Sequence, residues 1–189
     1  MYIDYTKEEI QQFENEIKEF FTKENINLVP GLDLVVTCRN LGFSMYSMTL
    51  PEKVDGLIYV KNDDKRIGVS NLLPLRDSRR VIAHELSHFI RKSKGMDGKE
   101  LLFALKDNIF HDNKKSKEEN EMDYMAAAIL VPMDSFLNEL KELKIKGLFS
   151  LEEVENRVDF KNIAYLTTVY DVDADLIKRR IVEACKYVA

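Results

Sequence analysis

Covalent crosslinks contribute little to this 189-residue chain, because its only two cysteines, Cys38 and Cys185, lie far apart and outside any CxxC pair. A disulfide framework or a zinc ribbon needs several cysteines at short spacings. We expect neither here, and the sparse cysteine content is typical of a protein in a reducing compartment.

Long hydrophobic runs are also missing. The longest, MAAAILVPM at residues 125–133, is too short to cross a bilayer and contains a proline. The first residues, MYIDYTKEEIQQFENE, include acids and no apolar segment of the kind found in a signal peptide. We therefore expect a cytoplasmic protein that has no membrane partner.

An excess of positive charge is absent as well, since 28 Lys and Arg against 33 Asp and Glu give a formal net charge of −5. Binding to a nucleic-acid backbone depends on a concentrated positive field, so we do not expect direct nucleic-acid binding. The sequence does contain 45% hydrophobic and 32% charged residues, a balance typical of a soluble globular protein. Its length suffices for one domain with a sizeable core.

The spacing of apolar residues predicts a mixture of helices and strands. Thr6 and Glu9 form a capping-box pattern ahead of an amphipathic helix over residues 7–23. A short helix is favoured within residues 32–42, where Gly42 is a plausible stop. Three strand-like runs follow, at residues 43–48, 56–62 and 66–71.

The rest of the chain is predicted to be mostly helical. A tight polar turn at residues 63–65 would join the last two strands into a hairpin. A helix with Asp77 or Ser78 as its N-cap is then expected to run to about Lys94. Further helices are predicted at residues 99–109, 118–130, 134–145, 150–168 and 173–187.

Two of the three histidines lie four residues apart in the stretch HELSH, residues 84–88. On an α-helix, residues i and i+4 are about 40° apart around the axis, so His84 and His88 face the same way and can bind one metal ion. Glu85 lies about 100° from His84, beside such an ion rather than among its ligands. This placement suits a general base that acts on a metal-activated water.

The apolar residues of the same helix cluster opposite the histidines: Ile82, Leu86, Phe89 and Ile90, with Ala83 among them. They can anchor the helix in a core while the histidines face a cleft. The competing interpretations are a pair of buried core histidines and an ordinary charged helix that contains the pattern by chance. The separation of the two faces favours the metal site.

A zinc site needs a third protein ligand. The segment ENEMDYMAAAILVP, residues 119–132, places Glu119 and Asp123 on one helix face. That face continues to Ala126, Ala127 and Leu130. The small alanines would allow close approach, so that Glu119 could reach the metal and Asp123 could accept a hydrogen bond from a ligating imidazole. An acid-rich, merely stabilising helix start is the alternative, and Glu121 or His111 would be the next candidate ligands.

The order of these motifs resembles the ImmA/IrrE family of zinc metallopeptidases, in which HExxH is followed by E-x-x-A-[N/D]-x-F-A-x-x-L-L-x-P. The resemblance covers most of the chain and is strongest over residues 66–132. It implies one zinc ion per chain in a gluzincin-like site with three ligands: His84, His88 and Glu119. Glu85 matches the catalytic glutamate, and Asp123 matches the position four residues after the third ligand. Three positions depart from the family pattern without removing a ligand: Ser87, Met122 and Met125.

The resemblance also implies a zincin-like α+β fold. In such a fold a small, mostly antiparallel sheet of three strands or slightly more packs on helices that include the HExxH helix, and the C-terminal region is helical. We expect a single metallopeptidase domain over residues 1–189. Its catalytic core would span about residues 25–135, and a helical subdomain about residues 136–189.

The chemistry predicted for this site is hydrolysis of a peptide bond. Glu85 would take a proton from a zinc-activated water that attacks the carbonyl, and would pass it to the leaving amine. Three residues are candidates for stabilising the oxyanion: His111, Tyr124 and Arg91. Residues 66–71, which lead into the metal helix, are expected to bind an extended substrate by strand addition, with a purely structural hairpin as the alternative.

Members of the ImmA/IrrE family are often regulatory proteases that cut or inactivate a helix-turn-helix repressor, on mobile genetic elements or in stress responses. The resemblance therefore implies such a repressor as the protein substrate. A non-catalytic metal-binding regulator of a repressor is the second hypothesis, and a chance motif or structural metal is the third. The presence of Glu85 and all three ligands favours the enzyme. Residues 163–180 have a loose helix-turn-helix spacing, but the acidic charge favours a bundle that packs the C-terminus.

Overall fold

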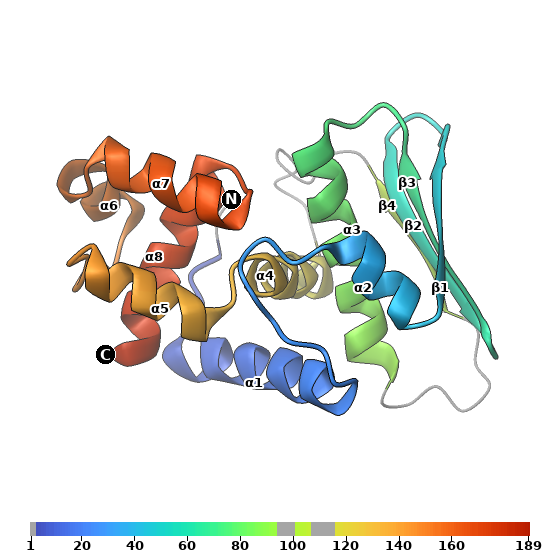
Figure 1. Cartoon of the computed structure of the whole chain (residues 1–189), viewed down its shortest axis with the longest axis horizontal. Helices are drawn as coiled ribbons and strands as arrows, with labels where there is room; N and C mark the ends of the chain where they lie inside the picture. The colour runs from blue at the N-terminus through green and yellow to red at the C-terminus, as the bar shows by residue number, and fades with distance from the viewer. Residues whose placement is uncertain (1–2, 94–100, 107–115) are drawn as a thin grey trace. The chain divides into compact units, whose positions relative to one another are not determined.

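The computed structural model describes residues 3–93, 101–106 and 116–189, and it has an α+β fold (Figure 1). The chain divides into two compact units. One unit includes Asp33–Ala126, and the other consists of Ile3–Leu32 and Ala127–Ala189. The described ranges contain eight helices and four strands. The predicted fold class, a small sheet with helices and a helical C-terminal region, is confirmed, while the predicted domain limits stay a prediction.

The first unit is built on a mixed, mostly antiparallel sheet with the strand order β1-β3-β2-β4. Its strands are β1 (Phe43–Met48), β2 (Val54–Lys61), β3 (Asp64–Ser70) and β4 (Leu101–Lys106). β3 pairs in parallel with β1 and antiparallel with β2, and β2 pairs antiparallel with β4. The β2–β3 turn is tighter than predicted and consists of Asn62 and Asp63, because β3 begins at Asp64.

The fourth strand takes the place of a predicted helix. The helix expected over residues 99–109 is wrong, because residues 101–106 form β4. The run LLFALK is almost wholly apolar, so its pattern cannot distinguish a buried helix from a buried strand. Pairing with β2 over almost its whole length determines the outcome, and that partner lies some forty residues away in the sequence.

The helix that carries the histidines, α3 (Leu75–Ser93), lies on one face of this sheet together with α2 (Leu34–Asn40) (Figure 1). α3 begins before Asp77 and Ser78, so the predicted N-caps are wrong. Instead the carbonyl of Pro74 accepts a hydrogen bond from the Ser78 amide at 2.9 Å, which closes the first turn. α3 packs against β2, β3 and β4, so the sheet fixes the position of the histidine helix.

The second unit is a helical bundle around α8. It comprises α1 (Lys7–Lys23), α5 (Met133–Glu142), α6 (Leu151–Arg157), α7 (Phe160–Tyr170) and α8 (Ala174–Val188). The predicted capping box at the start of α1 is confirmed. The helix predicted over residues 150–168 is divided in two, because Asp159 caps a new helix by accepting a hydrogen bond from the Lys161 amide.

α8 is a core element and not an exposed recognition helix. It contacts α1, α5, α6 and α7, and most of its residues from Leu176 to Cys185 are buried. The helix-turn-helix spacing of residues 163–180 therefore belongs to the bundle, the alternative that the acidic charge favoured. None of the helices in the described ranges is long and apolar enough to span a bilayer.

A buried ion cluster ties this bundle together. The guanidinium of Arg180 is fully buried and donates to Glu183 Oε2 at 2.8 Å, to Glu14 Oε1 at 2.9 Å and to the carbonyl oxygen of Val131 at 2.8 Å. These partners belong to α8, to α1 and to the residue that follows α4 (Lys117–Leu130). Such a network holds three segments in a fixed arrangement, because each buried charge depends on the others.

Candidate metal centre

His84 and His88 lie one turn apart in the middle of α3. Their Nε2 atoms are 3.2 Å apart, and their side chains are 1% and 2% exposed. Every residue from Val81 to Ile90 is buried, so the histidine face is enclosed like the apolar face. The expected contrast between a buried face and an open histidine face is therefore weaker than the sequence suggested, because α4 covers the histidines.

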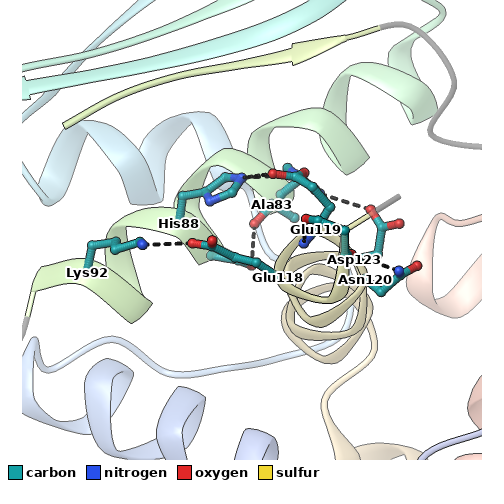
Figure 2. A network of polar contacts seen from close by, with 10 residues as sticks. Ala83, His88, Lys92, Glu118, Glu119, Asn120 and Asp123 are labelled. Carbon is teal, nitrogen blue, oxygen red and sulfur yellow. Dashed lines mark hydrogen bonds and ion pairs between the residues drawn. The ribbon is translucent and has the colours of Figure 1, made fainter. Parts of the chain in front are cut away.

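The residue of α4 that reaches both histidines is Glu119 (Figure 2). Its Oε2 lies 3.1 Å from His84 Nε2, and its Oε1 lies 3.6 Å from His88 Nε2. Among the described residues, these three side chains are the one group of His, Cys, Asp and Glu close enough to hold an ion together. The Glu119 side chain is 32% exposed, so solvent reaches the cluster beside this residue.

The donor atoms of the three side chains are grouped closely enough to surround one ion. Zinc binds imidazole nitrogen and carboxylate oxygen at about 2.0–2.2 Å, which gives a tetrahedron with edges of about 3.3–3.6 Å. The two histidine Nε2 atoms are 3.2 Å apart, His84 Nε2 lies 3.1 Å from Glu119 Oε2, and His88 Nε2 lies 3.6 Å from the other carboxylate oxygen, Oε1. Each contact is close to such an edge, and the carboxylate meets each histidine with a different oxygen. Two imidazoles and one carboxylate also form a donor set typical of catalytic zinc, with the fourth corner left for water or substrate.

Asp123, one turn after Glu119, determines which nitrogen of His84 carries a proton. Its Oδ1 lies 2.9 Å from His84 Nδ1. A carboxylate only accepts hydrogen bonds, so Nδ1–H donates and the lone pair of a neutral His84 is at Nε2. That lone pair is directed at the Glu119 carboxylate, and two acceptors face each other at 3.1 Å. A cation, either a proton or a metal ion, is required between them.

The pKa values of the cluster follow from the same geometry. Burial lowers the pKa of His84, but hydrogen bonds to Asp123 and Glu119 outweigh it and raise this pKa to about 9. Burial and the neighbouring charge of His84 lower the pKa of His88, and the hydrogen bond to His84 lowers the pKa of Glu119. Without metal the cluster therefore holds a proton on His84 at neutral pH, and a metal ion must displace it.

Glu85 lies on the side of α3 that faces β2. Its side chain is fully buried, and its charge contributes to the raised pKa of His84. A Cβ placed on Gly56 of β2 would lie 3.0 Å from Glu85 Oε1 and 2.3 Å from Val81 Cγ1. The absence of a side chain at Gly56 therefore makes room for Val81 and for the Glu85 carboxylate. Sequence reasoning missed Gly56, although a glycine inside a strand is a signal of close approach.

The other predicted residues are not among the clustered ligands, and one of them is not described. Arg91 donates through Nη2 to Glu121 Oε2 at 3.2 Å, so Glu121 pairs with a cation and is not among the clustered ligands. Tyr124 is a buried residue of α4 with 4% exposure. His111 lies outside the described residues. The oxyanion roles of His111, Tyr124 and Arg91 stay predictions.

A small sheet, a helix with the His-Glu-x-x-His pattern and a glutamate from a following helix together define a metallopeptidase-like fold and site. The chain belongs to the IrrE N-terminal-like domain family, Peptidase_M78, whose model matches residues 38–157. The match includes both histidines and the segment that carries Glu119 and Asp123. The predicted membership of the ImmA/IrrE family is confirmed.

One solved structure of similar fold is a Mycobacterium tuberculosis transcriptional regulator, with a TM-score of 0.54 and 18% sequence identity. The alignment covers 89% of this chain and 46% of the regulator, so this chain spans about half the length of that protein. At this identity the similarity shows a shared fold. A search of curated proteins found no match.

Proposed function

We propose that the protein is a zinc-dependent endopeptidase of narrow specificity that cleaves or inactivates a helix-turn-helix transcriptional repressor. The observation that carries the proposal is the close grouping of the donor atoms of His84, His88 and Glu119, all within 4.8 Å of one another. Glu85, on the same helix as the two histidines, adds a buried carboxylate. Membership of a peptidase family supports the same reaction class.

In this proposal each residue has one task. A bound zinc ion would supply Lewis acidity to the peptide carbonyl and would make water acidic enough to attack at neutral pH. Asp123 holds the His84 ring with Nε2 toward the ion. Glu85 accepts the proton of the attacking water and delivers it to the leaving nitrogen, so it ends the cycle unchanged.

An extended substrate would bind beside this site, but not at the strand that the sequence suggested. Strand addition at residues 66–71 is wrong, because β3 lies between β1 and β2 and is paired on both sides. The outer strands of the described sheet are β1 and β4. β4 is nearer to the proposed base, since its Leu105 pairs with Gly56, which lies against Glu85. We propose β4 as the strand to which a substrate adds.

A repressor substrate is supported by the resemblance to the ImmA/IrrE family, and a domain of this fold within a transcriptional regulator agrees with a role in transcription. Narrow specificity is supported by the enclosure of the site. With His84 and His88 almost fully buried, solvent meets the cluster beside Glu119. A polypeptide must therefore fit closely to present a peptide bond to these ligands.

The proposal is tested with a purified repressor encoded beside the gene, the full-length wild type and the variant Glu85→Gln. The matched control is Glu152→Gln, the same chemical change at an exposed residue of α6. We expect one zinc ion per chain in all three proteins and repressor cleavage by the wild type and the control only. Zinc is measured by elemental analysis and cleavage by mass spectrometry of the products.

Two outcomes would contradict the proposal in different ways. Cleavage that persists in Glu85→Gln would exclude Glu85 as the base. Stoichiometric zinc with repressor binding but no cleavage by the wild type would favour the second hypothesis, a non-catalytic metal-binding regulator.

A further inference from the structure

The face of α3 that carries the histidines continues for one more turn with two cations. Arg91 and Lys92 follow His84 at positions i+7 and i+8, so they lie on the same side of the helix as His84 and His88. This side faces α4, as the contacts of Glu119 with both histidines show. α3 therefore presents two metal ligands and then two positive charges to the same partner helix.

Both cations pair with acids of α4 that flank the third ligand. Lys92 Nζ lies 2.8 Å from Glu118 Oε1, and Arg91 Nη2 lies 3.2 Å from Glu121 Oε2. Figure 2 shows the Lys92–Glu118 pair next to the contact of Glu119 with His88. One ion pair thus precedes Glu119 in the sequence and the other follows it. The Arg91–Glu121 pair is the more buried, with both side chains less than one quarter exposed.

We propose that Arg91 and Lys92 are positioning residues that hold the first turn of α4 in the register at which Glu119 completes the metal site. This inference rests on the proposed metal site. It gives Arg91 a role that differs from the predicted oxyanion stabilisation.

The register of α4 has to be fixed because several residues at its start could serve as ligands. Four acids lie within six residues: Glu118, Glu119, Glu121 and Asp123. A rotation of α4 by one residue, about 100°, would present a different carboxylate to the histidines. Pairing Glu118 and Glu121 with the two cations leaves Glu119 and Asp123 for His84, the arrangement observed.

Glu119 is also the ligand that packing holds least. Its side chain is 32% exposed, whereas His84 and His88 are enclosed in α3. The histidines keep their positions through the core around them. The carboxylate depends on contacts made by its own turn of helix, which include the two ion pairs and the bonds to the histidines.

The direction in which zinc affinity changes distinguishes a positioning role from the mere presence of two cations near the metal site. A cation near a bound divalent ion repels it, so charges without a positioning role would weaken metal binding. Their removal would then strengthen zinc binding. If Arg91 and Lys92 position Glu119, their removal weakens zinc binding instead, by about tenfold, as expected when a group that orients a ligand is lost.

The test measures zinc affinity by chelator competition on the full-length protein carrying Arg91→Met and Lys92→Met together. The control is Lys117→Met, which removes a cation that approaches Glu121 from within α4 and makes no described contact with α3. The rescue is the exchanged pair Arg91→Glu with Glu121→Arg. Visible spectra of the cobalt-substituted proteins report whether the carboxylate still binds, and Glu119→Ala supplies the reference spectrum.

We expect about tenfold weaker zinc binding in the double variant, a cobalt spectrum shifted toward that of Glu119→Ala, and recovery of most of the affinity in the exchanged pair. The control should bind zinc at least as tightly as the wild type. Equal or tighter binding in the double variant overturns the proposal. If that variant does not fold, the two single variants and the exchanged pair decide by the same measurements.

Failure of this inference can be distinguished from failure of the proposed function. Wild-type protein that binds no zinc would contradict the metal site itself. Wild-type zinc binding that depends on His84, His88 and Glu119, but is unchanged in the double variant, would contradict only the positioning role.

Discussion

The backbone of Gly56 in β2 lies directly against the carboxylate of Glu85 in α3. A Cβ at this glycine would lie 3.0 Å from Glu85 Oε1, and it would overlap Val81 Cγ1 at 2.3 Å. The distance between sheet and helix is therefore limited at Val81, and the proposed catalytic base, one turn later, lies against the same glycine. A change as small as one methyl group at Gly56 must move either α3 or the side chains of Val81 and Glu85.

Gly56→Ala should lower peptidase activity more than it lowers zinc affinity, because the added methyl group meets Val81 and the proposed base Glu85 directly and none of the metal ligands. Overpacking of this kind costs about 1–3 kcal/mol of unfolding free energy. Cleavage rate, zinc affinity and urea unfolding are the measurements. Wild-type cleavage rates in Gly56→Ala would show that the contact does not position Glu85.

Gly68 of β3 provides the matched control for this substitution. A Cβ there would meet the Met48 Sδ at 3.0 Å and the Leu57 Cγ at 3.2 Å, both of them side-chain atoms that can shift. Gly68→Ala should therefore have a smaller effect on stability and leave cleavage unchanged.

The bond between Asp123 and His84 predicts a second result. Asp123→Ala removes the acceptor that orients the imidazole, so zinc affinity should fall by about 10- to 100-fold. Asp123→Asn should have an intermediate effect, because an amide oxygen still accepts a hydrogen bond from Nδ1–H but carries no charge. Chelator competition measures both. Equal affinities in all three proteins would mean that Asp123 does not orient the ligand.

Several parts of this structure follow from residues close together in the sequence. Thr6 and Glu9 form the capping box that starts α1, and His84 and His88 share a face because of helical periodicity. Glu119 and Asp123 lie on one face of α4 because of the same helical spacing. Such features need no knowledge of the partner segment, so the sequence alone predicts them.

Other parts depend on contacts between distant segments. Residues 101–106 become a strand because β2 offers its edge, which no local pattern in LLFALK reveals. Gly56 acquires its importance from Glu85, about thirty residues later. The ion pair of Arg91 with Glu121, thirty residues later, is likewise absent from any local pattern. In each case the partner sets the role of the residue.

In protein freed of metal, His84 should make stability depend on pH. The pKa of His84 rises from an ordinary value of 6.5 to about 9, so the folded state holds this proton more tightly than the unfolded state. The added stability is fully present below about pH 6.5 and is lost as the pH rises through about 9, with an upper limit of about 3 kcal/mol. Urea unfolding of chelator-treated wild type and His84→Gln, compared from pH 6 to 10, measures it.

The comparison with His84→Gln isolates this residue, because other groups that titrate between pH 6 and 10 are common to both proteins. The difference in unfolding free energy between the two proteins should shrink as the pH rises. A difference that stays constant across this range would mean that His84 is not protonated in the metal-free fold.

Arg180→Met should destabilise the protein more than the same substitution at an exposed arginine. The variant leaves the carboxylates of Glu14 and Glu183 and the carbonyl of Val131 buried without the guanidinium that they contact. Removing one partner from a buried ion pair costs about 3–5 kcal/mol of unfolding free energy.

Arg157→Met is the control, because its pair with a neighbour in α6 is exposed, and such pairs contribute about 0–1 kcal/mol. Urea unfolding of both variants gives the comparison. Equal losses would mean that the buried network contributes no more than a surface pair, and the unfolding midpoint of Arg180→Met would then lie close to that of the wild type.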